Sequence, residues 1–131
     1  MCRNDNGYIQ NRNIVGNARN HVNKNYIFSI DLKDFFTSID FNKVKFALFP
    51  NDEYNNIQKI ELAEFITKLC TYKGRLPQGA PTSPTLSNLI CKRLDHNLYQ
   101  LAREYNAKYS RYADDITFSC NKNIFKEPVP E

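Results

Sequence analysis

The sequence predicts an α+β fold in which helices pack on one face of an antiparallel sheet. Residues 26–32 (YIFSIDL) are rich in β-branched and aromatic side chains, a composition typical of a strand. Residues 109–119 contain two alternating runs that flank Ala113, Asp114 and Asp115, a pattern that predicts a β-hairpin with acids at its turn. Residues 84–105 repeat apolar side chains at helical spacing, so we expect a long helix behind the sheet.

The remaining segments predict shorter helices and one irregular loop. Helices are expected over residues 12–24, 41–49 and 57–69, and Asp40 is placed to cap the second, which ends before Pro50. Residues 73–84 (KGRLPQGAPTSP) hold three prolines and two glycines, which prevent regular structure. The side chains expected to form apolar helix faces are Ile14, Ala18, His21 and Val22; Ile57, Ile60, Ala63, Ile66 and Leu69; and Leu86, Leu89, Ile90, Leu94, Leu98, Leu101, Ala102 and Tyr105.

Length and charge describe a single domain with alternating basic and acidic segments. A chain of 131 residues is of the usual size for one domain. The net charge of +4 is distributed as an excess of basic residues in 1–30 and 71–113 and of acidic residues in 31–70 and 114–131. Basic surface favours a polyanionic partner, and carboxylates are what metal-dependent phosphoryl transfer requires. An ordinary solvated surface would account for the same charges.

The cysteines and the N-terminal sequence predict a reduced, cytoplasmic protein without a membrane segment. Cys2, Cys70, Cys91 and Cys120 lie far apart and form no CxxC pair, which argues against a zinc site. The chain begins with a polar segment rather than an apolar signal sequence, and no stretch is long enough to span a bilayer.

Three aspartates form the candidate catalytic group. Asp31 closes the predicted strand, and Asp114 and Asp115 lie at the turn of the hairpin. If these elements are neighbours in one sheet, the carboxylates converge and offer the hard oxygen ligands that Mg²⁺ prefers. Two such ions about 3.5–4 Å apart can stabilise both oxygens of an in-line displacement. The alternative is structural, because aspartate is common in turns and at exposed strand ends.

Four segments together resemble a known family. FSIDLKDFFTSID (residues 28–40) resembles motif A of reverse transcriptases, LPQGAPTSPTLSN (residues 76–88) resembles motif B, and YADD (residues 112–115) resembles motif C. Residues 17–21 (NARNH) match the NAxxH element of bacterial retron reverse transcriptases. The resemblance covers residues 11–120 and implies an RNA-directed DNA polymerase. It implies partial fingers over residues 1–25, a polymerase palm over residues 26–120, a tail over residues 121–131, and no thumb.

The resemblance also implies roles for individual residues. Asp31, Asp114 and Asp115, with the carbonyl of Leu32, would hold two Mg²⁺ ions, which Mn²⁺ could replace. Phe36 would be the steric gate that excludes ribonucleotides. The remaining expected contacts with the incoming nucleotide or primer are Gln78, Gly79 and Ala113.

Further residues carry a structural alternative beside the functional one. Arg12, Lys73, Arg75 and Arg111 are candidate phosphate contacts, although a residue of this kind is more often a solvated surface charge. Phe35 is expected in the core. His21 is more typical of a hydrogen-bonded structural histidine than of an acid or a metal ligand.

The implied partners are dNTPs and a structured noncoding RNA that serves as template and primer, with a role in phage defence and a possible retron effector protein. Motif D and the thumb motif of retron enzymes do not occur in the sequence, which leaves a second hypothesis open: a non-catalytic remnant or RNA-binding module. A third is another lineage such as a group II intron enzyme, because motifs A to C are shared.

Overall fold

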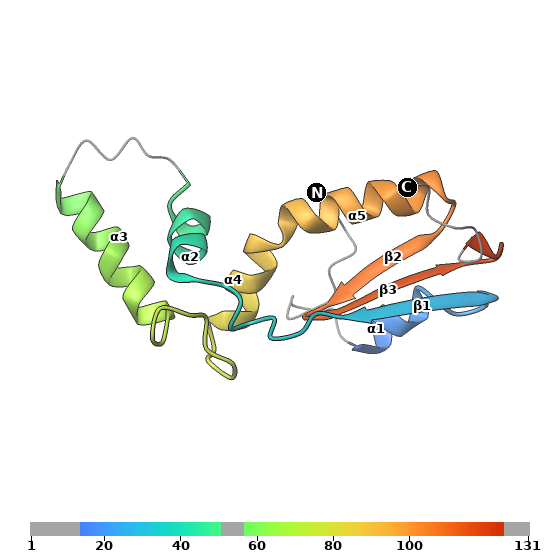
Figure 1. Ribbon diagram of the computed structural model, residues 1–131, viewed down its shortest axis with the longest axis horizontal. Coiled ribbons are helices and arrows are strands. Elements are labelled where there is room, and N and C mark those ends of the chain that lie inside the picture. The colour runs from blue at the N-terminus through green and yellow to red at the C-terminus, as the bar shows by residue number, and fades with distance from the viewer. Residues whose placement is uncertain (1–13, 51–56, 125–131) are drawn as a thin grey trace. The chain divides into compact units, whose positions relative to one another are not determined.

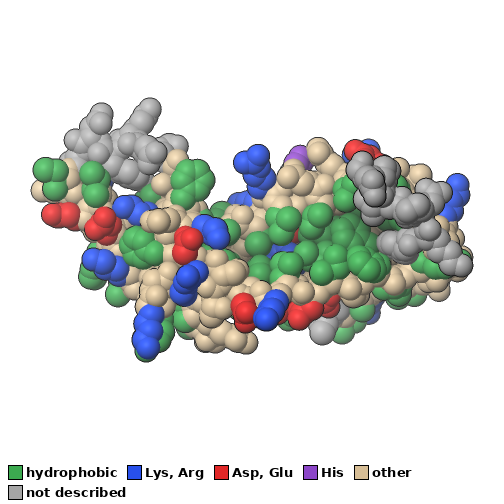
Figure 2. Space-filling view, viewed as in Figure 1, with side chains coloured by type: hydrophobic (Ala, Val, Ile, Leu, Met, Phe, Trp, Pro, Cys, Tyr) green, Lys and Arg blue, Asp and Glu red, His purple; other side chains and the backbone are tan. Residues whose placement is uncertain are grey.

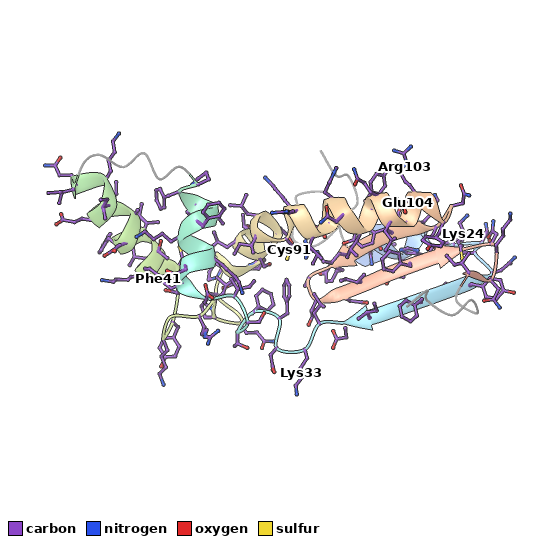
Figure 3. The ribbon with its side chains drawn as sticks, turned by 45° about the horizontal axis from the view of Figure 1, so that its top comes forward. Lys24, Lys33, Phe41, Cys91, Arg103 and Glu104 are labelled. Atoms are coloured by element: carbon purple, nitrogen blue, oxygen red, sulfur yellow. The ribbon has the colours of Figure 1, made fainter. Side chains whose placement is uncertain are left out.

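The computed structural model describes residues 14–50 and 57–124, and these divide into two compact units (Figure 1). The unit called here the sheet unit takes residues up to 32 and from 92 onward, and the helical unit takes residues 33–91. Lys33, labelled in Figure 3, is therefore the first residue of the helical unit. The expected boundaries between fingers, palm and tail stay predictions.

The predicted antiparallel sheet is present in the sheet unit. It contains β1 (Tyr26–Asp31), β2 (Lys108–Tyr112) and β3 (Asp115–Cys120) in the order β1-β3-β2, so two segments far apart in the sequence lie side by side (Figure 1). The partners of β1 in β3 run from Tyr26 opposite Cys120 to Asp31 opposite Asp115. The chain is thus an α+β protein, as predicted.

Helix α5 (Lys92–Glu104) covers one face of this sheet. Its Ala102 forms a buried cluster with Tyr109 of β2 and Ile116 of β3, which the partly buried Leu98 and Phe118 extend. Side chains alternate between the two faces of a strand, so Asp31 and Asp115 lie on the opposite face from this cluster. The predicted placement of a helix behind the acidic residues is confirmed.

Helix α1 (Ile14–Arg19) departs from the prediction that the helices share one face. His21, just after α1, binds the hydroxyls of Ser110 and Ser119, which alternation places on the face away from α5. The predicted apolar face of this helix is also wrong in part, because Ala18 and Val22 are exposed while His21 is buried.

The predicted long helix is interrupted. Helix α4 (Ser83–Ile90) belongs to the helical unit and α5 to the sheet unit, and Cys91 between them has a ψ of −1°. The amide of Cys91 reaches the carbonyls of both Ser87 and Leu89, a tightened arrangement that ends the regular helix. The prediction of one continuous helix is therefore wrong.

The apolar stripe predicted for this segment is only partly buried. Leu94, Leu101 and Tyr105 of α5 are 39%, 46% and 52% exposed, whereas Leu86 of α4 is buried. Figure 2 shows hydrophobic side chains gathered on the surface of the sheet unit, over the region where Figure 1 draws α5 and the strands. Leu94, Leu101 and Tyr105 therefore lie on the surface, although the sequence predicts a helix packed behind the sheet.

The helical unit contains α2 (Phe41–Leu48), α3 (Ile57–Cys70) and α4, with α2 packed against the other two. As predicted, Asp40 caps α2, because its carboxylate accepts a hydrogen bond of 2.9 Å from the amide of Lys43. From the predicted stripe of α3, Ala63 is buried, but Ile57, Ile60 and Leu69 are exposed. As expected, residues 73–82 form an irregular loop.

Cys70, Cys91 and Cys120 are free thiols and at least half-buried. Among the helices of the described residues, none has both the length and the apolar character needed to span a bilayer.

Candidate active site

The predicted juxtaposition of the acidic residues is confirmed at the level of the backbone. Asp31, the last residue of β1, lies directly opposite Asp115, the first residue of β3. Side chains that face each other in this way have Cβ atoms about 4.5–5.5 Å apart. The amide of Leu32 donates a hydrogen bond of 3.0 Å to the carbonyl of Asp114. The backbones of the three aspartates therefore lie at one end of the sheet.

The donor set at this end suits a hard cation. Asp31 and Asp115 are exposed and Asp114 is half-buried, and their carboxylates repel one another unless positive charge lies between them. Oxygen ligands of this kind fit Mg²⁺, which keeps several waters and binds through few carboxylates. Within residues 14–50 and 57–124, however, no three His, Cys, Asp or Glu side chains are gathered closely enough to hold a metal. Metal ligation by the aspartates and the Leu32 carbonyl stays a prediction.

A buried ion pair lies directly behind the acidic turn. The guanidinium of Arg111 is fully buried and donates to both carboxylate oxygens of Asp95 of α5, at 2.7 and 2.8 Å. Its Nη1 donates to the carbonyl of Ala113 at 2.8 Å, and the hydroxyl of Tyr109 donates to Asp95 at 2.6 Å. The expected phosphate contact at Arg111 is therefore corrected, because its donors face the protein interior.

Ala113 occupies the first position of the turn in a strained conformation. Its φ is +55°, in the left-handed region that residues other than glycine rarely adopt, and its side chain is buried. Its expected place beside a primer terminus stays a prediction.

Comparison with known proteins identifies the family of this motif-bearing chain. The family model described as reverse transcriptase (RNA-dependent DNA polymerase) matches residues 1–125. The chain belongs to the reverse transcriptase family.

Retron enzymes are among its relatives, which confirms the predicted resemblance to retron-type reverse transcriptases. The chain is 44% identical over 113 residues to the retron Ec86 reverse transcriptase of Escherichia coli, an alignment that covers 86% of this chain and 34% of that protein. It is 34% identical over 137 residues to the retron Mx162 reverse transcriptase of Myxococcus xanthus, covering 95% of this chain and 28% of that protein. The chain thus spans about a third of the length of these relatives.

His21, the histidine of the NAxxH element, has a structural role, as expected. Its Nδ1 lies 2.6 Å from the hydroxyl of Ser119 and its Nε2 lies 2.6 Å from that of Ser110. Burial, and then the charge of Lys108, lower the pKa of His21, while Asp115 acts in the opposite direction. A neutral imidazole can donate through one nitrogen and accept through the other, so this site holds α1 onto the sheet.

The predicted nucleotide contacts of the helical unit lie on its loops. Phe35 is in the core, as expected, and its ring meets that of the half-buried Phe36 edge to face at 5.1 Å. Gln78 and Gly79 are exposed, and Gly79 has a φ of +88°, which favours glycine. The roles of Phe36, Gln78 and Gly79 in nucleotide binding stay predictions.

Two of the basic residues predicted to contact phosphates, Lys73 and Arg75, lie on a tight turn in the helical unit. Lys73 and Gly74 have φ values of +49° and +72° between the bridged residues Tyr72 and Arg75. The ammonium of Lys73 lies 5.4 Å from the centre of the Tyr72 ring, and Arg75 donates to the carbonyl of Thr37 at 3.3 Å. Both basic residues are exposed, so phosphate binding by them stays a prediction. Arg12 lies outside the described residues.

The sequence-based predictions did not include Asp95 and Tyr109, which form the buried hydrogen bonds around Arg111. The signal available was spacing, since Asp95 lies three and seven residues before Leu98 and Ala102, on the face that α5 turns to the sheet.

Proposed function

We propose that the chain forms the catalytic part of an RNA-directed DNA polymerase, which adds dNTPs to a primer paired with an RNA template. The observation that carries this proposal is the pairing of Asp31 with Asp115, beside the hydrogen bond from Leu32 to Asp114. Membership of the reverse transcriptase family supports it.

In this proposal the acidic group holds the metal ions of the reaction. Asp31, Asp114 and Asp115 would bind Mg²⁺ with help from the Leu32 carbonyl. Mg²⁺ held there would supply Lewis acidity that lowers the pKa of the primer hydroxyl and positive charge that offsets that of the departing pyrophosphate. Positioning accounts for much of the catalysis of phosphoryl transfer, so the place of Asp31 and Asp115 on paired strands and of Asp114 in the adjoining turn matters in addition to their charge.

The other predicted residues would select and orient the substrate. The ring of Phe36 would lie beneath the sugar and exclude a 2′-hydroxyl, while Gln78 and Gly79 would contact the incoming nucleotide. The small side chain of Ala113 would leave room for the primer end. A structured noncoding RNA would serve as template and primer, and a part in phage defence with an effector protein would follow the resemblance to retrons.

Primer extension tests this proposal. The full chain is incubated with Mg²⁺, dNTPs and an RNA template carrying a DNA primer, and the products are resolved by length. We expect extension by the wild type and loss of at least about a hundredfold in rate for Asp114→Asn/Asp115→Asn, the scale of losing electrostatic stabilisation of a transition state. Asp34→Asn is the control, because it removes an exposed carboxylate that is close to Asp31 in the sequence but lies outside the acidic group.

The outcome that contradicts the proposal is equal product from the wild type and the double variant. If neither extends the primer but the chain retains affinity for the RNA, the non-catalytic RNA-binding hypothesis is favoured instead. Dependence of that affinity on salt would then identify contacts with phosphates.

A further inference from the structure

The buried Arg111 connects the acidic turn to the helix behind the sheet. Two of its nitrogens, Nε and Nη2, donate to the two carboxylate oxygens of Asp95, and the third, Nη1, donates to the carbonyl of Ala113. Asp95 is itself held, because the hydroxyl of Tyr109 donates to its Oδ1. Asp95 therefore fixes the orientation of the Arg111 guanidinium, whose third nitrogen contacts the turn.

The turn is held on both sides of Asp114. The carbonyl of Ala113 precedes Asp114 in the chain and accepts from Arg111 at 2.8 Å. The carbonyl of Asp114 itself accepts from the amide of Leu32 at 3.0 Å. Each carbonyl belongs to one of the two planar peptide groups that flank the Cα of Asp114. Fixing both planes fixes the direction in which the Asp114 side chain leaves the backbone.

The strain at Ala113 shows that the turn needs such support. A non-glycine residue persists in the left-handed region only where its surroundings impose it, and such residues gather at functional sites. Ala113 has a φ of +55°, and its own carbonyl is the atom that Arg111 binds. The contact therefore acts at the strained residue, directly before the predicted metal ligand.

We propose that Arg111, oriented by Asp95, is a positioning residue that fixes the Ala113–Asp114 turn and thereby sets the direction of the Asp114 carboxylate. The inference rests on the proposed function, in which the Asp114 carboxylate has to point toward bound Mg²⁺. The ion pair joins α5 to β2, and the third nitrogen of the same guanidinium extends this connection to the turn. Arginine suits the task since its planar donors can bind a carboxylate with two nitrogens and a carbonyl with another, which a lysine ammonium cannot do in the same geometry.

The test measures the turn and the metal site separately in the full chain. Amide hydrogen exchange at Leu32 reports the contact of the turn with β1, and titration with Mn²⁺ alone reports the acidic group. The main variant is Asp95→Leu/Arg111→Met, which removes both charges and leaves neither one buried without a partner. We expect exchange at Leu32 to accelerate and Mn²⁺ affinity to fall, each by about tenfold, the factor that a lost charge-assisted hydrogen bond produces. The amides of β3 should keep their protection.

Two further variants separate positioning from general stability. Tyr109→Phe removes a hydrogen bond to the same Asp95 carboxylate but leaves Arg111 on Ala113, so it should change both measurements less than the double variant does. If the double variant does not fold, Arg111→Lys takes its place. It should likewise accelerate exchange at Leu32 and lower Mn²⁺ affinity.

The outcomes distinguish the positioning claim from the proposed function. Unchanged exchange at Leu32 in the double variant, or faster exchange with unchanged Mn²⁺ affinity, overturns the inference. A wild type that neither binds Mn²⁺ nor extends a primer overturns the proposed function, and exchange at Leu32 then still decides whether Arg111 fixes the turn.

Discussion

At the scale of single residues, burial decides which polar side chains are structural. His21 lies on the sheet face that carries Ser110 and Ser119, with both ring nitrogens hydrogen-bonded. Protonation would force both nitrogens to donate and would place a charge in a buried site near Lys108. The lowered pKa of His21 therefore means that the folded protein favours the neutral ring.

This preference predicts a pH dependence of stability. The unfolded chain takes up the His21 proton near its ordinary pKa of about 6.5, whereas the folded chain takes it up only at lower pH. The unfolded state thus binds more protons between these values, so the stabilisation is complete above pH 6.5 and is lost as the pH falls through the lowered folded pKa. Thermal unfolding between pH 8 and pH 5 should show this loss in the wild type.

The control for this prediction is the second histidine. His96→Gln removes an exposed imidazole from α5 and should leave the pH dependence in place, whereas His21→Gln should lower stability at pH 8 and flatten the dependence. Identical pH profiles for wild type and His21→Gln would contradict the lowered pKa.

Residue-scale prediction from the sequence was accurate where the pattern was local. Strand alternation placed Asp31 at the end of a strand, and the turn signal placed Asp114 and Asp115 beside a hairpin turn. Their convergence was predicted only on the condition that the two elements are neighbours in one sheet, and the pairing of β1 with β3 meets that condition. The prediction was wrong for Arg111, because its burial depends on Asp95, sixteen residues earlier and on another element. A sequence does not reveal which charged residue will find such a partner.

At the scale of elements, capping explains where α2 begins. Asp40 is extended, with φ −84° and ψ 169°, and its carboxylate accepts from the amide of Lys43. The ion pair between the same side chains is exposed and 3.9 Å long, so its contribution is small beside that of the cap.

We therefore expect Asp40→Ala to lower the free energy of unfolding by about 1 kcal/mol, the typical value of an N-cap. Asp40→Asn keeps an acceptor oxygen at the same position and should stay close to the wild type, although it abolishes the ion pair. Chemical denaturation of the three proteins measures both values. Equal losses for the two variants would assign the stabilisation to charge rather than to the cap.

Elements were predictable wherever neighbouring residues determine them. The strands, the hairpin, the cap of α2 and the loop after α3 follow from alternation, propensity and proline. The break at Cys91 was not predictable, because the apolar spacing continues from Leu86 to Tyr105 without a proline or glycine. The position of α1 was not predictable either, since it depends on buried hydroxyls of β2 and β3.

At the scale of the whole molecule, exposed apolar side chains are the main departure from the sequence-based expectation. Phe28 and Ile30 of β1 are 45% and 40% exposed, on the face of the sheet that α5 covers over β2 and β3. Leu94, Leu101 and Tyr105 form an exposed stripe along α5. Helical periodicity correctly identified the stripe but could not show whether other parts of a protein cover it.

Exposed apolar surface of this kind promotes association. We expect the chain to bind an apolar fluorescent dye and to self-associate with rising concentration. Leu101→Glu should reduce both effects, because it places a charge within the stripe while its side chain is already 46% exposed. The measurements are dye fluorescence and light scattering, with circular dichroism to verify that the fold is retained.

Val22→Glu provides the matched control, since Val22 is 59% exposed but follows α1, on the other face of the sheet from α5. A reduction by Leu101→Glu alone assigns the association to the stripe on α5. An equal reduction by both variants would instead trace it to the net charge of the chain, since each adds one negative charge to a protein of charge +4. The two substitutions change charge identically, so their difference isolates the contribution of this one apolar surface.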